Sequence, residues 1–392
     1  MPCGRKQIIV ASSHVWGGHI KTGTEHLAEQ FHADGWEVLF LSSPISPLHL
    51  FHRRSWAQSR RKLKMVRPAM AERRPGFHLL SPFTLLPHVN RFPLNSSFTL
   101  RAWHRLTLPP LEACIERLGF GEARLILFDN IVCWPMLRSH PGKKVYRLAD
   151  RIDRFKVISK AMLRTQQAVF READLVIYTA RDLAKQLTDR KGPSLLLPNG
   201  VDHAFFSAPR PVPVEYQEVK SPRILYMGSV EDWFDFEQFN QATARFPDAT
   251  FFVIAPESPF LQRLEKRSNV RILGHRPYAS LPAYLQHADI GLIPFDMENH
   301  HELLDSVSPL KLFEYLSAGL PVISYDGREI RNLEAPVMRY SPQRPLHEAI
   351  ALLLKQKEEN AMFSKDTLRE FASKADWKRK YEILLAELAK ML

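Results

Sequence analysis

The sequence predicts an α/β protein built from two doubly wound, Rossmann-like domains that face each other across a cleft. Three observations predict this fold. The chain has 392 residues, which is more than a single domain usually contains. Short apolar runs alternate with helical stretches in both halves, as expected around parallel sheets. A proline-rich stretch after residue 197 separates the two series.

The first half, residues 1–205, is predicted to be the first domain. Its helices are expected at 22–33, 160–172 and 180–189. Residues 43–110 are rich in proline, arginine and aromatic residues, and we interpret them as an irregular insertion carrying short helices. The expected strands are 7–13, 37–41, 125–128, 144–148, 175–178 and 194–197.

The second half begins after the breakers Pro198 and Gly200. The second domain is predicted to span 206–375, and residues 346–392 are expected to form terminal helices. The last helix, 376–392, is predicted to pack back on the first domain. The expected strands are 223–227, 250–254, 270–273, 290–293 and 321–324.

Charge is distributed unevenly between the halves. Up to Phe205 there are 31 Lys and Arg against 16 Asp and Glu, whereas the remainder has 23 against 26. The excess peaks between Arg53 and Arg74, with nine basic residues and one acid. This run is either a solvated loop or a patch that meets an anionic membrane surface. The patch would comprise Arg53, Arg54, Arg60, Arg61, Lys62, Lys64 and Arg67.

Cysteine content and hydropathy bear on the compartment. The chain has three cysteines without metal-ligand spacing, which favours a reducing compartment. The apolar run at 7–13 is too short for a signal peptide, and no window reaches the length of a membrane span. We therefore expect a cytoplasmic protein attached peripherally to the inner face of the membrane.

The most informative segment is 306–324 (SVSPLKLFEYLSAGLPVIS). It predicts a helix capped by Ser308, with Pro309 in the first turn and Gly319 at its end. Lys311 in the first turn is poorly placed for the helix dipole, but beside a helix N-terminus it favours a diphosphate. Glu314 lies on the same face and is suited to ribose hydroxyls. The alternative is a Lys–Glu pair on an ordinary helix surface.

This segment resembles the donor-binding helix of glycosyltransferases with the GT-B fold. Three other segments resemble the same proteins in the same order. Ser12-Ser13-His14 with the loop at Gly17 and Gly18 resembles their acceptor-side loop, where Lys21 is a candidate contact for an acceptor phosphate. Residues 226–235 (YMGSVEDWFD) resemble the first strand and loop of their second domain, and residues 270–278 (VRILGHRPY) resemble the segment that frames the nucleotide base.

Within these enzymes the chain is most similar to the xanthan-type beta-glucuronosyltransferase family. The link is 144–150 (KVYRLAD), which resembles the tyrosine-arginine-x-x-aspartate strand end of that family. The resemblance implies that Asp150 is the general base of an inverting transfer. Asp150 could instead pair structurally with a neighbouring arginine, and Asp153 is the competing carboxylate.

The resemblance implies a nucleotide-sugar donor, expected to be a UDP-sugar such as UDP-glucuronate, and a lipid-linked saccharide acceptor. No Asp-x-Asp triplet ends a strand, so neither a metal nor another cofactor is expected. The predicted donor-binding residues are Gly228, Ser229, His275, Arg276, Phe295, Ser308, Lys311 and Glu314, and those predicted on the acceptor side are His14, Gly17, Gly18 and Lys21.

Some positions depart from the family pattern. Glu314 replaces a glutamine and Phe295 a tyrosine, while Ser306 stands where retaining GT-B enzymes carry a second glutamate. A retaining transferase and a nucleotide-sugar epimerase therefore remain alternatives. A nucleic-acid-binding protein is a third, suggested by the basic pI. Confinement of the positive charge to one half argues against nucleic acid as a partner.

Overall fold

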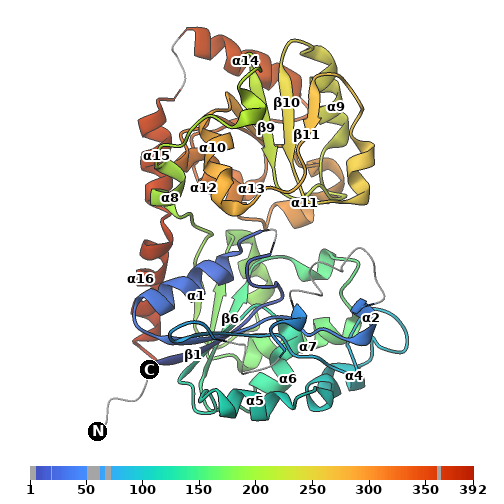
Figure 1. Cartoon of the computed structure of the whole chain (residues 1–392), viewed down its shortest axis with the longest axis vertical. Coiled ribbons are helices and arrows are strands. Elements are labelled where there is room, and N and C mark those ends of the chain that lie inside the picture. Colours follow the sequence, from blue (N-terminus) through green and yellow to red (C-terminus); the bar gives the residue numbers. More distant parts are fainter. Residues whose placement is uncertain (1–5, 19, 51–61, 67–71, 360–362) are drawn as a thin grey trace. The chain divides into compact units, whose positions relative to one another are not determined.

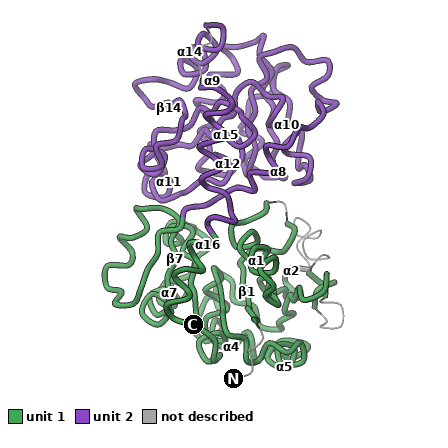
Figure 2. The backbone as a smooth tube through the Cα atoms, turned by 90° about the vertical axis from the view of Figure 1, so that its left-hand side faces the viewer, with its two compact units in different colours: residues 1–197, 381–392 green, residues 198–380 purple. Residues whose placement is uncertain are grey.

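The computed structural model describes residues 6–18, 20–50, 62–66, 72–359 and 363–392 (Figure 1). The chain forms two compact units (Figure 2). Unit 1 contains Met1–Leu197 and Tyr381–Leu392, and unit 2 contains Pro198–Lys380. Each unit is an α/β domain with its own sheet and its own apolar core.

The sheet of unit 1 has eight strands among the described residues, in the order β3-β4-β2-β1-β5-β6-β7-β8. All neighbours are parallel except β3 and β4. The middle strands are buried along their whole length, because helices cover both faces of such a sheet. The strands are β1 Gln7–Ala11, β2 Glu37–Leu41, β3 Glu72–Arg74, β4 Phe77–Leu80, β5 Leu125–Phe128, β6 Lys143–Leu148, β7 Leu175–Tyr178 and β8 Ser194–Leu196.

The helices of unit 1 lie between these strands. Thr22 caps α1 by accepting the amide of Glu25, and Ser159 caps α7 by accepting that of Met162. The α-helices are α1 Gly23–Ala33, α2 Pro47–Leu50, α4 Ser97–Ala102, α5 Leu111–Arg117, α6 Trp134–Leu137 and α7 Lys160–Glu172. The short 3-10 helices are η3 Trp103–Leu106, η4 Ile131–Cys133, η5 Ile152–Arg154 and η6 Arg181–Leu187.

The segment 43–110 is more regular than we predicted from its composition. Strand β4 pairs with β2 in parallel register, so that Val38 lies opposite Phe77 and Leu41 opposite Leu80. The segment therefore extends the sheet, and its interpretation as an irregular insertion was wrong for 72–80. The alternating apolar residues in FHLL were the available signal, hidden by the flanking prolines and arginines.

The sheet of unit 2 has six parallel strands among the described residues, in the order β11-β10-β9-β12-β13-β14. Strand β9 is central, and the chain crosses from one side of it to the other. Such a crossover creates a topological switch point, where doubly wound folds bind ligands. The strands are β9 Arg223–Met227, β10 Thr250–Ile254, β11 Val270–Ile272, β12 Ile290–Ile293, β13 Val322–Tyr325 and β14 Met338–Tyr340.

The helices of unit 2 follow the same alternation. Gly319, at φ +76°, ends α12 in the left-handed conformation that glycine tolerates best. The α-helices are α8 His203–Ser207, α9 Phe236–Arg245, α10 Leu281–Gln286, α11 Met297–Leu304, α12 Leu310–Ser317, α13 Arg328–Asn332, α14 Leu346–Glu358 and α15 Lys365–Ser373. The 3-10 helices are η7 Val214–Tyr216, η8 Pro259–Arg263 and η9 Tyr278–Ser280.

The last helix, α16 Trp377–Leu388, begins in unit 2 and ends in unit 1. Within unit 2, the Trp377 amide donates to the Val201 carbonyl at 3.0 Å. Within unit 1, the Tyr381 ring packs edge-on against Phe31 at 4.9 Å, and its hydroxyl donates to Asp34 at 3.1 Å. The end of the chain therefore packs on α1 and belongs to unit 1.

Candidate active site

Polar residues of unit 1 gather where three adjacent strands end. Ser12 follows β1, Asp129 follows β5, and Asp150 lies two residues beyond β6. Because carboxyl ends of parallel strands meet at one edge of the sheet, these residues belong to one cluster. Sequence reasoning singled out Asp150 but missed Asp129, although its position directly after a predicted apolar strand was a usable signal.

Asp129 organises the loop after β1. Its carboxylate accepts the Ser13 amide at 2.6 Å, the Thr24 hydroxyl at 2.6 Å and the Ser12 hydroxyl at 3.2 Å. Arg147 lies on β6, is 6% exposed, and interacts electrostatically with both Asp129 and Asp150. Asp129 is therefore fully engaged in holding the loop and compensating a buried guanidinium.

Asp150 differs from Asp129 in having no hydrogen bond to its carboxylate within the described part of unit 1. Burial raises the pKa of Asp150, the positive charges of Arg147 and His14 lower it, and Asp129 raises it. The residue is only partly covered from solvent. A carboxylate with a raised pKa and unused acceptor atoms is suited to accept a proton.

Asp153 is held in a different way. Arg151 binds its carboxylate through Nε at 2.9 Å and Nη2 at 2.6 Å, and Arg154 approaches to 3.4 Å. The hydrogen bonds from Arg151 lower the pKa of Asp153. Since a bidentate arginine stabilises the charged form, Asp153 is a poor candidate for a general base.

The four residues predicted on the acceptor side lie in or next to the loop after β1. The His14 ring nitrogen Nδ1 is 3.1 Å from the Ser13 hydroxyl. Gly17 has φ +62°, and at Gly18 a Cβ would lie 3.0 Å from the Val15 carbonyl oxygen, so both positions suit glycine. Lys21 forms an ion pair with Glu29 at 2.5 Å, so its ammonium is already compensated.

In unit 2, helix α12 presents its N-terminus without a side-chain cap. Our prediction that Ser308 caps this helix was wrong: Pro309 occupies the cap position, and the Ser308 hydroxyl accepts the Asn199 amide at 3.3 Å. The Asn199 side chain also donates to the Ser308 carbonyl at 2.6 Å. The first amides of α12 are therefore left for another acceptor, which favours an anion.

Lys311 lies in the first turn of α12 and is directed toward the end of β9. Its ammonium is 3.1 Å from the Tyr226 hydroxyl, 4.3 Å from the centre of the Tyr226 ring and 4.9 Å from that of Phe295. Burial lowers the pKa of Lys311 to about 7, and Glu314 opposes this shift. Burial thus opposes the charged form of Lys311, the two aromatic faces favour it, and an incoming anion would favour it further.

Gly228 and Ser229 follow β9 beside this lysine. A Cβ at Gly228 would lie 2.5 Å from the Lys311 ammonium, and the glycine has φ +141°. The Tyr226 hydroxyl donates to the Ser229 carbonyl at 2.5 Å. In this arrangement a Cβ at Gly228 would displace the end of the Lys311 side chain. Gly228, Ser229 and Lys311 lie together at the end of β9, with the Phe295 ring beside the lysine. Sequence reasoning missed Tyr226, because an aromatic residue inside an apolar strand signals only a core position.

Glu314 and Phe295 are both buried, at 8% and 6% exposure. Glu314 is close enough to Lys311 to raise its pKa. The Phe295 ring packs against Tyr325 at 5.2 Å.

His275 and Arg276 lie on the loop after β11, outside the group of residues around Lys311. The Arg276 guanidinium donates to Glu215 at 2.7 Å, to the Tyr284 hydroxyl at 3.0 Å and to the Leu273 carbonyl at 2.6 Å. This guanidinium is used within the domain to hold the loop after β11, while His275 is exposed on that loop. We therefore interpret Arg276 as a residue that positions the loop.

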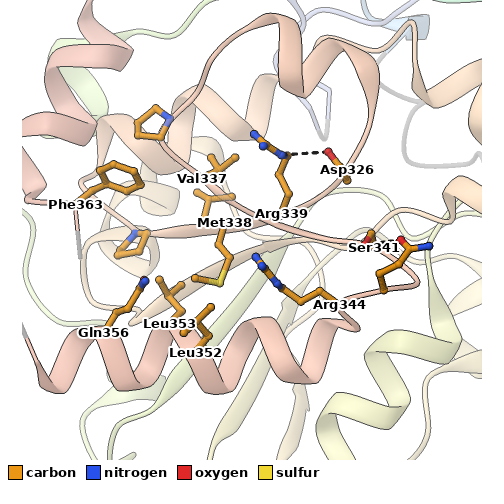
Figure 3. A pocket seen from close by; sticks show the side chains of 14 residues that line it. Asp326, Val337, Met338, Arg339, Ser341, Arg344, Leu352, Leu353, Gln356 and Phe363 are labelled. Carbon is orange, nitrogen blue, oxygen red and sulfur yellow. Dashed lines mark hydrogen bonds and ion pairs between the residues drawn. The ribbon is translucent and has the colours of Figure 1, made fainter. Parts of the chain in front are cut away.

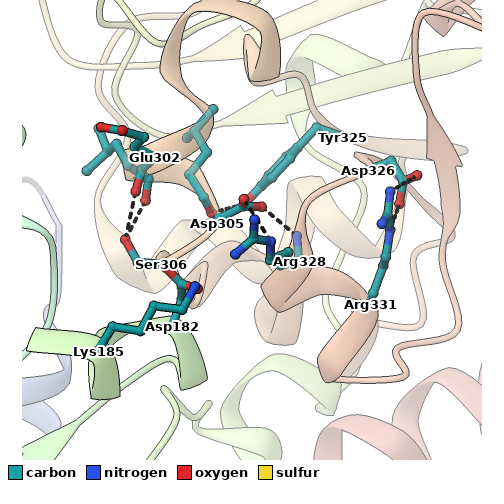
Figure 4. A network of polar contacts seen from close by, with 11 residues as sticks. Asp182, Lys185, Glu302, Asp305, Ser306, Tyr325, Asp326, Arg328 and Arg331 are labelled. Carbon is teal, nitrogen blue, oxygen red and sulfur yellow. Dashed lines mark hydrogen bonds and ion pairs between the residues drawn. The ribbon is translucent and has the colours of Figure 1, made fainter. Parts of the chain in front are cut away.

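A polar network fixes the segment that leads into α12 (Figure 4). The Asp305 carboxylate accepts the Arg328 amide at 2.8 Å and faces the Arg328 side chain at 3.4 Å. The Tyr325 hydroxyl donates to the Leu304 carbonyl at 3.2 Å. These contacts tie the end of α11 to β13 and α13, so that the start of α12 has a defined position.

A cavity of about 560 Å³ lies elsewhere in unit 2, along β14 and α14 (Figure 3). Val337, Met338, Leu352 and Leu353 form its apolar wall, and Arg344 lies at its side (Figure 3). None of the predicted donor-binding residues lines this cavity.

The remaining predictions concern metal binding and attachment to a membrane. Among the described residues there is no cluster of three metal-ligating side chains, and no helix is long and apolar enough to cross a membrane. In the predicted membrane patch, Lys64 is exposed, whereas Lys62 is buried and donates to the Ser43 hydroxyl at 2.8 Å. Burial lowers the pKa of Lys62 to about 8, so this lysine does not belong to a surface patch. Arg53, Arg54, Arg60, Arg61 and Arg67 lie outside the described residues.

Comparison with known proteins identifies both halves of the chain. Residues 10–179 match the family described as the N-terminal domain of glucuronosyltransferase GumK. Residues 221–356 match the family described as glycosyl transferases group 1.

Two curated relatives are each 28% identical to the chain. TuaH of Bacillus subtilis, named for teichuronic acid biosynthesis as a glycosyltransferase, matches over 193 residues, 47% of each chain. The UDP-glucuronate:glycolipid 2-beta-glucuronosyltransferase of Xanthomonas campestris pv. campestris matches over 207 residues, 52% of this chain and 49% of that protein. The matched region thus spans about half the length of these relatives.

Solved structures agree in fold over almost the whole chain. Sucrose-phosphate synthase from Thermosynechococcus elongatus superposes with a TM-score of 0.67 at 16% identity, covering 98% of both chains. Anabaena HepE in complex with UDP-glucose superposes with a TM-score of 0.65 at 14% identity, covering 98% of this chain and 100% of that one. The chain therefore has the GT-B fold of these glycosyltransferases, with a first part that matches the GumK N-terminal domain and a second part that matches the group 1 glycosyltransferases.

Proposed function

We propose that this protein is a glycosyltransferase of polysaccharide synthesis, which moves a sugar from a UDP-sugar to a lipid-linked saccharide acceptor. The single observation that carries the proposal is the arrangement around Lys311. An uncapped helix N-terminus, a half-buried lysine ammonium and a glycine that leaves space for it lie together at the end of the central strand of unit 2. This combination is suited to a nucleotide diphosphate.

The relatives favour uridine as the nucleoside. One solved neighbour is in complex with UDP-glucose, and one curated relative is named for the use of UDP-glucuronate with a glycolipid. On this proposal Lys311 and the α12 amides neutralise the leaving diphosphate, and Glu314 accepts the ribose hydroxyls. These groups supply the positive charge, so we propose that the transfer needs no metal.

We propose Asp150 as the general base of an inverting transfer. Its carboxylate takes the proton of the acceptor hydroxyl while that oxygen attacks the anomeric carbon from the face opposite the nucleotide. The bond from the anomeric carbon to the diphosphate oxygen breaks, and UDP leaves with its negative charge near Lys311. Support comes from the contrast among the carboxylates. Those of Asp129 and Asp153 are fully engaged, whereas that of Asp150 accepts no hydrogen bond within the described part of unit 1 and has a pKa raised by burial.

Inversion is favoured over retention by Ser306. Its hydroxyl is buried and donates to the Leu303 carbonyl at 2.7 Å, so this position offers no carboxylate to the donor sugar. The raised pKa and the unused acceptor atoms of the Asp150 carboxylate fit a single base, which inverting transfer requires.

The proposal is tested first by binding. Thermal shift with UDP, ADP, GDP and UDP-sugars should show the largest stabilisation with uridine diphosphates; a ligand at 100 times its Kd stabilises by about 2.7 kcal/mol. Equal shifts with all three diphosphates would remove the uridine assignment, and no shift with any would remove the donor site. An epimerase would convert a UDP-sugar in the absence of an acceptor, so product analysis without acceptor separates the two enzymes.

A further inference from the structure

Glu25, in the first turn of α1, is a buried carboxyl group that the proposed chemistry does not use. The residue is 2% exposed, and its Oε1 atom is buried without a hydrogen-bond partner. Its Oε2 atom accepts the Gly17 amide at 3.4 Å. An unpartnered buried oxygen is uncommon in folded proteins and calls for a physical reason.

An ordinary helix cap does not explain this glutamate. The sequence Thr22-Gly-Thr-Glu25 has the spacing of a capping box, in which the glutamate returns to the amide of the cap residue. Here Thr22 does cap the helix by accepting the Glu25 amide at 3.4 Å. The Glu25 side chain, however, reaches past Thr22 to Gly17, so it contacts the loop that follows β1 instead of closing the box.

That loop, residues 13–18, is held at its two ends by acidic side chains. At the start, Asp129 accepts the Ser13 amide at 2.6 Å. At the end, Glu25 accepts the Gly17 amide. Between them, the Trp16 ring packs against Phe40 at 4.9 Å and Phe77 at 4.7 Å, which fixes the outer part of the loop.

The charged groups that face Glu25 would not neutralise a negative charge on its carboxylate. Lys21 is engaged by Glu29 at 2.5 Å, and Asp129 and Glu29 are themselves acidic. Burial raises the pKa of Glu25 to about 8. The Gly17 amide and Lys21 act to lower this pKa, whereas the negative charges of Glu29 and Asp129 act to raise it. An ionised Glu25 would leave Oε1 charged and without a donor, a costly arrangement for a buried group.

We propose that Glu25 is a positioning residue that holds the loop 13–18, and with it His14, in place as an uncharged carboxylic acid. Ionisation of Glu25 brings water to Oε1 and loosens the Gly17 end of the loop. The inference rests on the proposed function only in assigning this loop to the acceptor side. The loop and its glutamate are properties of unit 1 alone.

The sign of the pH effect follows from the raised pKa. An unfolded Glu25 ionises near 4.5, whereas the folded one keeps its proton to about 8. The contribution of the protonated Glu25 to stability is therefore complete below pH 4.5 and is lost as the pH rises toward 8. Glu25→Gln keeps the uncharged shape and the acceptor for Gly17 but has no proton to lose.

The test compares melting temperatures and hydrogen exchange of the full chain at pH 5 and pH 8.5. Glu25→Gln and wild type should melt together at pH 5, and the variant should melt a few degrees higher at pH 8.5. Wild-type exchange in peptide 13–18, corrected for intrinsic rates, should rise at pH 8.5 but not in Glu25→Gln. Glu25→Ala should lose protection at both pH values. Gln30→Ala, which changes a half-buried, uncharged residue of the same helix, serves as the control.

A constant difference in melting temperature between Glu25→Gln and wild type across this range would overturn the proposal. So would equal protection of peptide 13–18 in wild type and Glu25→Ala. Neither readout uses a donor or an acceptor, so failure here is distinct from failure of the proposed function. UDP binding to unit 2, measured by calorimetry, should be unchanged in all three variants.

Discussion

The Lys311 ammonium lies 3.1 Å from the Tyr226 hydroxyl and directly over the Tyr226 ring, 4.3 Å from its centre. In this position the lysine is half-buried, and the aromatic ring favours its charged form in place of a carboxylate ion pair. Binding of an anion beside a lysine held in this way favours the charged form of that lysine. Two predictions follow from this pair.

Removal of the ammonium should weaken donor binding. Lys311→Ala is expected to reduce UDP affinity by one to two orders of magnitude, which is the size of a lost charge-assisted contact of about 1.5–3 kcal/mol. Isothermal calorimetry measures this directly. Lys355→Ala, which removes an exposed lysine from α14, is the matched control and should bind like wild type. Unchanged affinity in Lys311→Ala would show that the diphosphate lies elsewhere.

UDP binding should also take up a proton at alkaline pH. Because burial lowers the pKa of Lys311 to about 7, the free enzyme is largely uncharged at this position at pH 8. A bound diphosphate favours the charged form and raises that pKa, so up to about one proton is taken up per UDP at pH 8. Calorimetry in buffers of different ionisation enthalpy should give different apparent enthalpies for wild type. Identical enthalpies across these buffers would contradict a neutral Lys311; in Lys311→Ala they should coincide.

Asp150→Asn should keep donor binding and lose turnover. The expected loss is about 10²–10⁴-fold, as for other positioned bases. The acidic limb of the pH–rate profile, set by the raised pKa of Asp150, should disappear in the residual activity. Asp153→Asn is the control, because its carboxylate is neutralised by Arg151 and Arg154. A silent Asp150→Asn beside an inactive Asp153→Asn would reverse the assignment.

Asp129→Ala should destabilise unit 1. The substitution leaves the Ser13 amide and the Thr24 hydroxyl without their acceptor and reduces the compensation of the buried Arg147. Loss of one partner of a buried charged network costs on the order of 3 kcal/mol. Urea unfolding followed by a probe in unit 1 measures the change. Asp153→Ala removes an exposed ion pair and should lower the free energy of unfolding by less than about 1 kcal/mol. Equal destabilisation by the two substitutions would contradict the central role of Asp129.

Membrane attachment is a separate prediction, based on the basic run between Arg53 and Arg74. Since each basic residue near an anionic surface contributes about 1 kcal/mol, replacement of Arg60, Arg61 and Lys64 by serine should abolish flotation with anionic liposomes at low salt. Serine at Lys266, Lys355 and Lys374, which are exposed in unit 2, removes the same charge and should leave flotation intact. The proposed membrane patch would be contradicted if the wild type did not float, or if the wild type and both variants floated equally.

The sequence predicted most strands, because buried parallel strands are continuous apolar runs that end at turn residues. The strands 37–41, 125–128 and 223–227 are observed with the predicted limits. It failed at β3, β4 and β14, which are three or four residues long and lie among prolines and arginines. Strands this short depend on their neighbours for stability, so local pattern alone does not reveal them.

A candidate site residue could be predicted from the sequence where its side chain is unfavourable for the local structure. An example is the lysine in the first turn of α12, where the helix dipole disfavours a positive charge. Residues whose role depends on tertiary contacts were missed or misread. Asp129 gains its role from Thr24, which is 105 positions away, and Arg276 is engaged by Glu215, 61 positions away. Ser308 has the sequence context of a cap, but Asn199 determines its contacts. Such long-range pairings are fixed by the fold and leave no local pattern.

The proposed transfer is tested most directly by incubating the protein with radiolabelled UDP-sugars and the glycolipid fraction of its source organism. With wild type, the label from one UDP-sugar should move into the lipid fraction with release of an equal amount of UDP. Asp150→Asn, which should still bind UDP, should transfer at least about 100-fold less. The linkage formed should have the anomeric configuration opposite to that of the donor. Transfer by Asp150→Asn at the wild-type rate, or release of free sugar without labelled lipid, would contradict the account.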